Sequence, residues 1–230
     1  MRSRDDAIAP LASMLRGGRG GEVRLKLYLS AIWMAGNPPY DVTFPARAWA
    51  ELLGLTDPNN NGSRRIADAM TWLDANSFIK VERVPGQPSK LVVLDDGGRG
   101  SDYRPPWSAK DRYVQLPPEL WTKGWMAVLK ARALALLLIL LDQRDSRDPA
   151  RRIWLSPRIA GELYDLSPDT WTKGTAELED YGVIDVARRP VREDFGWTRV
   201  RKTYSLDLTR LEAAPDASLD LRLGAFAEKT

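Results

Sequence analysis

The chain contains no cysteine and no histidine. These absences exclude disulfide bridges, thiol nucleophiles, imidazole bases and the common zinc sites, each of which needs one of the two side chains. Long apolar runs are also missing, because the longest, residues 133–141, is flanked by charged residues and is shorter than the roughly 20 residues that span a bilayer. We therefore expect no metal, no cofactor and no membrane segment.

Signals for export and for catalysis are also absent from the sequence. The first six residues are mostly charged or polar and lack the apolar stretch of a secretory signal, so we expect a cytoplasmic protein. The glycine cluster at 17–21 lacks the flanking strand and the Lys-Ser or Lys-Thr pair of a phosphate-binding loop. Glu51 and Glu162 stand beside apolar residues on expected helices, as surface or capping charges do. We expect no enzyme.

Size and charge favour two domains with a locally basic surface. A chain of 230 residues, 43% of them apolar, suits two domains of about 100 residues each. The net charge is only +3, so any positive surface must come from local clustering. Residues 185–203 provide such a cluster, with six basic residues against three acidic ones.

One pattern occurs twice in the chain, once in each half. Each copy predicts a helix, a second helix and the first strand of a hairpin, the order of a helix-turn-helix followed by a β-ribbon wing. The three segments lie at 48–55, 66–73 and 78–81 in the first copy, and at 159–166, 171–178 and 183–186 in the second.

The two copies differ in length between their helices. Leu166 follows Leu55 by 111 residues, whereas Leu178 follows Leu73 by 105, so the second copy lacks six residues. The extra six in the first copy, 57–62, include Pro, Asn and Gly, which form turns, and we expect a loop there. The alternative is a chance alignment of two amphipathic helix pairs.

The predicted fold is mainly α with small β-hairpins (α+β), built from two winged helix-turn-helix domains in tandem. The expected organisation is a flexible segment at 1–22, a first domain at 23–95, a linker at 96–112, a second domain at 113–208 and a tail at 209–230. Expected helices cover 23–35, 45–53, 63–76, 130–144, 157–164 and 169–181, and expected strands 41–44, 79–84, 90–94, 113–116, 183–189 and 198–208.

The second helix of the first copy carries candidate DNA-reading residues. With Ile66 on the buried face, a period of 100° per residue turns Arg64 and Asp68 outward, with Arg65 on the flank. Arginine can contact guanine with two hydrogen bonds, whereas Asp68 is expected to orient a neighbouring arginine. The alternative is a set of solvated charges. The candidates are Ser63, an expected N-cap, with Arg64, Arg65, Asp68 and Thr71.

The second copy predicts a different outward face. Thr172 and Lys173 at the helix start suit phosphate or base contact, and Ala176 could meet a thymine methyl group. The C-terminal half of this helix is acidic, with Glu177, Glu179 and Asp180, so we expect only its first turn or two to enter a groove.

The wing of the second copy is the most basic predicted element. Alternation along its second strand places arginines on one face, as in a ribbon that lies along phosphates or in a minor groove. The alternative is a charged edge strand that prevents aggregation. The basic residues are Arg188, Arg189, Arg192, Arg199, Arg201 and Lys202.

Four of the nine tryptophans lie in apolar patterns and are expected in the core: Trp33, Trp49, Trp154 and Trp171.

The repeated order of scaffold helix, helix-turn-helix and wing resembles the winged-helix superfamily over 23–94 and 113–208. Tandem pairs of this size are similar to replication initiators of iteron plasmids and to some bacterial transcriptional regulators. The initiator resemblance implies that Arg64, Arg65, Thr172 and Lys173 read DNA. The long helical N-terminal region and overtly basic surface of many initiators are not evident in this chain.

These patterns predict a sequence-specific double-stranded DNA-binding protein that acts in transcriptional control or in replication or maintenance of a mobile element. The alternative is a winged-helix protein-interaction module in a complex that organises chromosomes or plasmids, which the low net charge and the acidic helix end favour. The tail at 209–230 either packs on the second domain or contributes a homodimer contact, and the sequence leaves both open.

Overall fold

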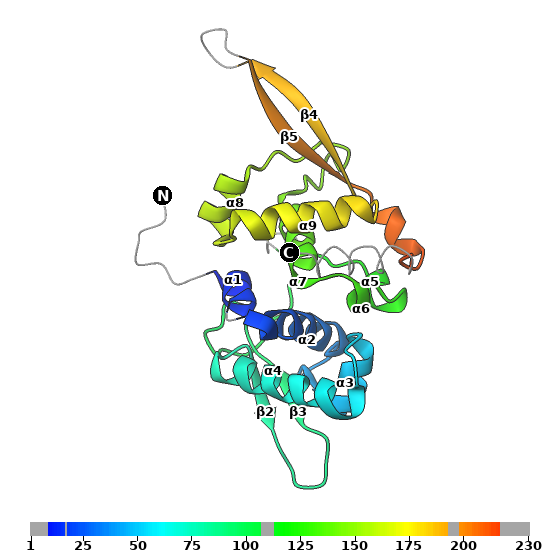
Figure 1. The fold of residues 1–230 in the computed structure, drawn as a ribbon. Helices are drawn as coiled ribbons and strands as arrows, with labels where there is room; N and C mark the ends of the chain where they lie inside the picture. The colour runs from blue at the N-terminus through cyan, green and yellow to red at the C-terminus, as the bar shows by residue number, and fades with distance from the viewer. Residues whose placement is uncertain (1–8, 17, 107–112, 193–197, 217–230) are drawn as a thin grey trace. The chain divides into compact units, whose positions relative to one another are not determined.

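The computed structural model describes residues 9–16, 18–106, 113–192 and 198–216. Over these residues the protein is a mixed α+β structure with nine α-helices and two small antiparallel sheets (Figure 1). The chain divides into two compact units, Met1–Arg112 and Tyr113–Thr230, and each is described by itself. No helix in the described residues is long and apolar enough to cross a membrane.

The first unit is a cluster of helices that carries a three-stranded sheet with strand order β1-β3-β2. Its core gathers buried side chains from both parts, among them Trp49, Ile66 and Leu91. Scaffold helix α2 packs against α4, and the β2–β3 hairpin follows directly after α4. The elements are α1 Pro10–Leu15, α2 Gly21–Met34, β1 Asp41–Thr43, α3 Ala46–Leu52, α4 Ser63–Ala75, β2 Ile79–Glu82 and β3 Lys90–Val93.

The turn between α3 and α4 differs from the predicted loop. Residues Pro58–Gly62 form a π-helical turn that runs straight into α4. Asp57 starts this turn with a left-handed backbone (φ 50°), and its carboxylate accepts a hydrogen bond from the Asn61 amide at 3.2 Å. This side-chain hydrogen bond caps the turn. Asp and Asn side chains often make such local hydrogen bonds to the backbone in loops, but here the bond closes a helical turn, so the insertion is helical.

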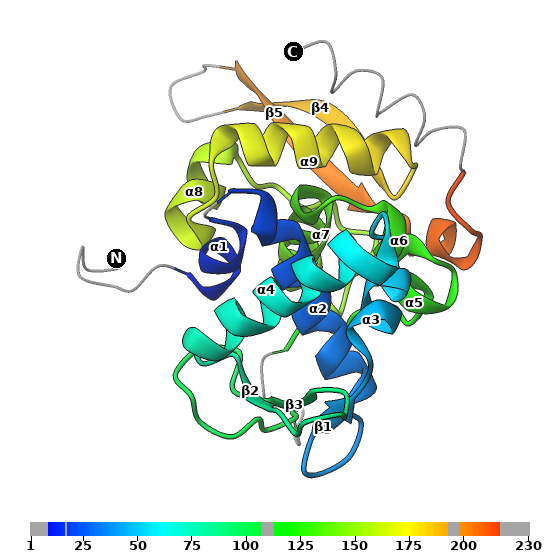
Figure 2. The ribbon, with the colours of Figure 1, turned by 60° about the horizontal axis from the view of Figure 1, so that its bottom comes forward.

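The second unit has the same plan with a longer hairpin. Helix α9 packs along scaffold helix α7, α8 lies against α9, and the two nine-residue strands pair with each other as an antiparallel ribbon (Figures 1 and 2). The elements are α5 Glu119–Thr122, α6 Trp125–Val128, α7 Ala131–Gln143, α8 Pro157–Tyr164, α9 Pro168–Asp180, β4 Ile184–Arg192, β5 Thr198–Leu206 and the 3₁₀ turn Leu208–Glu212.

Backbone details repeat between the units at the predicted offsets. Gly54 and Asp165, 111 residues apart, both follow the first helix with positive φ (68° and 55°). Ser77 and Gly182, 105 apart, both follow the second helix with positive φ (61° and 71°). The residue immediately before the strand then donates to the last turn of the helix, as Phe78 does to the Leu73 carbonyl and Val183 to the Leu178 carbonyl. The sequence repeat is therefore a repeat of local backbone geometry.

The predicted strand at 113–116 does not form. In the first unit, β1 follows the scaffold helix and pairs with β3. The matching place in the second unit is Ile153, which forms a single bridge with Tyr204 of β5. The residue that pairs at the edge of β5 therefore follows the scaffold helix, whereas residues 113–116 precede that helix and pair with no strand.

Segments predicted to lie outside the domains are partly packed. Within 1–22, α1 packs on α2, and its Ala12 and Met14 are buried. Gly21 permits this packing because it has no side chain: a Cβ there would lie only 2.6 Å from the Leu15 carbonyl oxygen. Within 96–112, the Tyr103 ring packs edge-on against the Tyr40 ring, with the ring centroids 5.2 Å apart. At the start of the tail, Leu211 is buried and accepts a hydrogen bond from Trp125 at 3.0 Å. Tail residues 217–230 lie outside the described part.

The prediction of a tryptophan core is half right. Trp49 and Trp171 are buried, as predicted, whereas Trp33 and Trp154 are each 43% exposed, so their assignment to the core is wrong. Trp154 follows the bridge residue Ile153 on a sheet edge, and side chains alternate between the two faces of a strand. An apolar neighbourhood in sequence therefore does not bury it.

Gly174 in α9 should be intolerant of a side chain. A Cβ there would lie 2.6 Å from the Arg132 carbonyl oxygen of α7, so Gly174→Ala must push two packed helices apart. We expect a loss of about 1–3 kcal/mol, the range for overpacking a filled core. Thermal unfolding of the full chain measures it.

The matched control is Gly161→Ala in α8, because both substitutions introduce the residue that the first unit has at the equivalent position, Ala50 or Ala69. A Cβ at Gly161 would contact only the Leu166 carbonyl oxygen, at 3.3 Å. Equal Tm values for the two variants would contradict the packing described here.

Candidate nucleic-acid interface

Helix α4 presents a polar face to solvent and an apolar face to the core. Ile66, Ala69, Met70 and Leu73 are buried, so the predicted orientation of the helix is confirmed. Arg64, Asp68 and Thr71 are exposed, and Arg65 is half-buried on the flank. Among the described residues no ion pair joins Asp68 to either arginine, so Asp68 does not orient them through an ion pair.

Ser63 does not act as the predicted N-cap. The N-cap position of α4 is Gly62, and the Ser63 hydroxyl instead donates to the Pro58 carbonyl in the preceding turn. The physical reason is that the π-helical turn continues into α4, so the first amides of the helix already have acceptors upstream. Thr71 also turns its hydroxyl to the backbone, donating to the Ala67 carbonyl at 3.0 Å.

A hollow of about 680 Å³ borders the start of α4. Its lining includes Arg64 and Arg65 from α4 and Arg24 from α2, together with Glu22 and Asp68. Three guanidinium groups against two carboxylates leave this concave surface with a positive excess.

Arg24 is a part of this surface that sequence reasoning missed. Its guanidinium donates to the Arg16 carbonyl at 2.8 Å and lies over the Trp72 ring at 4.4 Å. Trp72 stacks in turn on Phe78, with ring centroids 6.0 Å apart. Partial burial lowers the pKa of Arg24 from its ordinary value. The residues that contact Arg24 are far from it in sequence. The helical spacing within 23–35 therefore does not predict these contacts.

The outward face of α9 is less favourable for DNA than predicted. Thr172, Lys173 and Ala176 are exposed, as their spacing predicts. The Lys173 ammonium, however, lies 3.0 Å from the Asp169 carboxylate one turn earlier, and the Thr172 hydroxyl donates to the Pro168 carbonyl. Exposed Glu179 and Asp180 add two negative charges to the far end of the helix.

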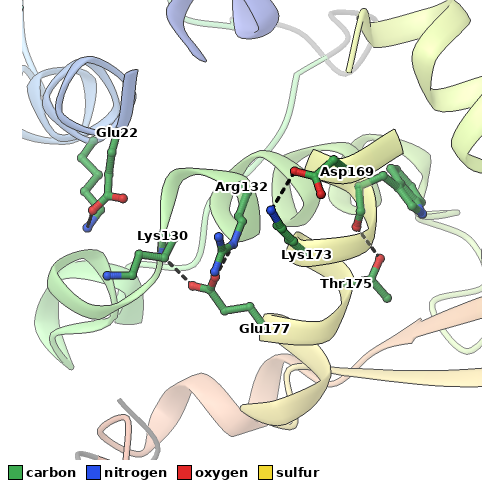
Figure 3. A network of polar contacts seen from close by, with 9 residues as sticks. Glu22, Lys130, Arg132, Asp169, Lys173, Thr175 and Glu177 are labelled. Atoms are coloured by element: carbon green, nitrogen blue, oxygen red, sulfur yellow. Dashed lines mark hydrogen bonds and ion pairs between the residues drawn. The ribbon is translucent and has the colours of Figure 1, made fainter. Parts of the chain in front are cut away.

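Glu177 belongs to the packing between helices and not to the exposed acidic end (Figure 3). Its buried carboxylate accepts hydrogen bonds from the Lys130 amide at 2.6 Å and from Arg132 Nε at 3.0 Å. It therefore caps the start of α7 and joins that helix to α9. Burial, the largest effect, raises the pKa of Glu177, against the opposing influence of the Lys130 amide and Arg132.

The β4–β5 ribbon places its basic residues on both faces. Arg188 stands opposite Lys202, and Arg189 stands opposite Arg201. Opposite residues share a face and neighbours alternate, so the pair of Arg189 and Arg201 stands on one face and the pair of Arg188 and Lys202 on the other. Arg192 and Arg199 lie in the strands, but their side chains lie outside the described part.

The base of the ribbon is braced by a segment that the predictions did not include. Arg152 donates to Thr203 Oγ1 at 3.0 Å, to the Asp185 carboxylate at 2.7 Å and to two backbone carbonyls. Two residues later, Trp154 lies under the Arg201 guanidinium, 4.4 Å from ring centroid to Cζ. The contacts depend on the register of Ile153 with Tyr204, which no local pattern indicates.

Comparisons with known proteins give no assignment for this surface. No protein-family profile matches the chain, and no curated protein matches it. Among the described residues, no group of three or more His, Cys, Asp or Glu side chains is placed to hold a metal ion.

The raised pKa of Glu177 predicts a specific pH dependence of stability. The folded chain binds the Glu177 proton more tightly than the unfolded chain, so this residue favours folding most below its unfolded pKa, about 4.3, and less as pH rises through its folded pKa. Replacing it by glutamine removes this dependence. The difference in free energy of unfolding, native protein minus Glu177→Gln, should therefore decrease as the pH rises from 4 to 7.

Denaturant unfolding at several pH values measures the difference, with exposed Glu179→Gln as the control for removing one charge from the same helix. A native protein that gains stability over Glu177→Gln as pH rises would contradict the described environment.

Proposed function

We propose that the protein is a tandem pair of winged helix-turn-helix units that binds double-stranded DNA with sequence specificity. The observation that carries the proposal is the exposed face of α4, where Arg64 and Arg65 stand at the start of the second helix of such a unit. Residues at the start of this helix reach base edges in the major groove in helix-turn-helix proteins. The role would be cytoplasmic, in transcriptional control or in replication or maintenance of a mobile element.

The architecture supports this proposal through its repeated geometry. Each unit has a scaffold helix, two helices joined by a turn with positive φ, and an antiparallel hairpin after the second helix. The hairpins provide wings, and the second wing adds basic residues beside its helix. The hollow at α2 and α4 supplies Arg24 as a further cation near the predicted reading residues.

A second candidate function is a protein-interaction module. The paired Lys173 and the exposed Glu179 and Asp180 give α9 an outward face with more negative than positive charge, which suits a protein partner better than phosphate. A stable protein partner that copurifies with the chain, in a sample free of nucleic acid, would favour this function over DNA binding.

The test of the first proposal begins with selection of bound duplexes from a random pool. We expect a defined motif and an affinity that falls steeply with salt. Arg64→Ala/Arg65→Ala should reduce discrimination between the selected and a random duplex by about tenfold or more, since a bidentate arginine contributes about 1–3 kcal/mol of base discrimination.

The charge-matched control is Arg99→Ala/Lys123→Ala, which removes two exposed cations that belong neither to α4 nor to either hairpin. Competition binding measured by fluorescence anisotropy compares the two variants. Undetectable or salt-insensitive binding of the native protein to every duplex would refute the proposal.

A further inference from the structure

The β4–β5 ribbon brings like charges together across its strands. Arg188 faces Lys202 in one cross-strand pair, and Arg189 faces Arg201 in the next. Like charges directly opposite each other destabilise a sheet. Among the described residues, no carboxylate lies within ion-pair distance of Arg188, Arg189 or Lys202. A ribbon that needed charge only to protect its edges could alternate signs, so this arrangement indicates an anionic ligand.

The ribbon is also built to hold its shape at the base. Arg152 joins both strands through Asp185 on β4 and Thr203 on β5. The Arg201 guanidinium lies over the Trp154 ring, and this contact restricts the Arg201 side chain. Ligand binding therefore removes less conformational freedom from Arg201. The face with Arg189 and Arg201 is therefore partly ordered before any ligand arrives.

Helix α9, in contrast, offers little to a polyanion. Its only exposed cation, Lys173, is paired with Asp169, and its other exposed charges are Glu179 and Asp180. With Glu177 turned into the core, the exposed side chains of α9 carry one positive charge against three negative ones. Of these two elements, the ribbon and not α9 presents a surplus of positive charge.

We propose that the second unit contacts the phosphate backbone of duplex DNA through the β4–β5 ribbon and does not read bases through α9. This inference rests on the proposed DNA-binding function and divides it: α4 reads sequence, and the ribbon adds affinity that is independent of sequence. Contacts with phosphate fix the position of a protein on the duplex, whereas contacts with bases give specificity.

The test measures binding of the full chain to a selected and a random duplex at several salt concentrations. Each phosphate contact contributes about 0.9 to the slope of log K against log salt concentration. Arg189→Ala/Arg201→Ala should lower the magnitude of the slope by about 2 and weaken binding to both duplexes by the same factor. Arg189→Lys/Arg201→Lys keeps both charges and should keep the slope.

Thr172→Ala/Lys173→Ala on α9 is the matched comparison, and it should leave discrimination between the two duplexes unchanged. The thermal midpoint of every variant checks that the substitutions leave the fold intact. An unchanged slope in Arg189→Ala/Arg201→Ala, or a tenfold loss of discrimination in Thr172→Ala/Lys173→Ala, would overturn the inference.

The outcomes separate this inference from the proposed function. Suppose that the native protein binds its selected duplex and that Arg64→Ala/Arg65→Ala loses discrimination. If the ribbon variants then do not show the expected change in slope, only the division of contacts is refuted. If the native protein binds no duplex, both proposals fail. Tighter binding to single-stranded than to duplex DNA that depends on Trp154 would also overturn the inference, because the exposed ring would then serve to stack bases.

Discussion

The close packing of the second helix on the scaffold helix is the constraint on which each unit depends. In the second unit, Gly174 lets α9 approach the Arg132 carbonyl so closely that no Cβ would fit, and Glu177 caps the start of α7 from the same face. In the first unit, Ile66 and Leu73 hold α4 against its core with no exposed surface. Because these contacts fix the rotation of each helix about its axis, they determine which side chains face solvent.

The two units keep this constraint and differ in what they expose. α4 turns Arg64 outward, with Arg65 on its flank, beside a hollow with a positive excess, whereas the outward face of α9 is mainly acidic. The second unit instead carries two cross-strand pairs of basic residues on a ribbon longer than the β2–β3 hairpin. A duplicated scaffold thus carries two different charged surfaces, and this difference leads to the proposed division between reading bases and binding phosphates.

Sequence patterns predict the parts of this structure that depend on local spacing. The period of 100° places Ile66 inward and Arg64 outward, and the offsets of 111 and 105 locate the equivalent turns. What they miss depends on contacts across long stretches of chain. Glu177 points inward because of partners 47 and 45 residues away, and Trp154 is exposed because of its register beside β5. The helical turn at 58–62 depends on one side-chain cap, which composition alone does not reveal.

Interference footprinting on a selected duplex tests the division of contacts between the two units most directly. Methylated guanines that block binding report base contacts, and ethylated phosphates that block binding report backbone contacts. We expect blocking guanines in one cluster and blocking phosphates both around that cluster and in a second region without blocking guanines. Two separate clusters of blocking guanines would show that both helices read bases, and would contradict the account.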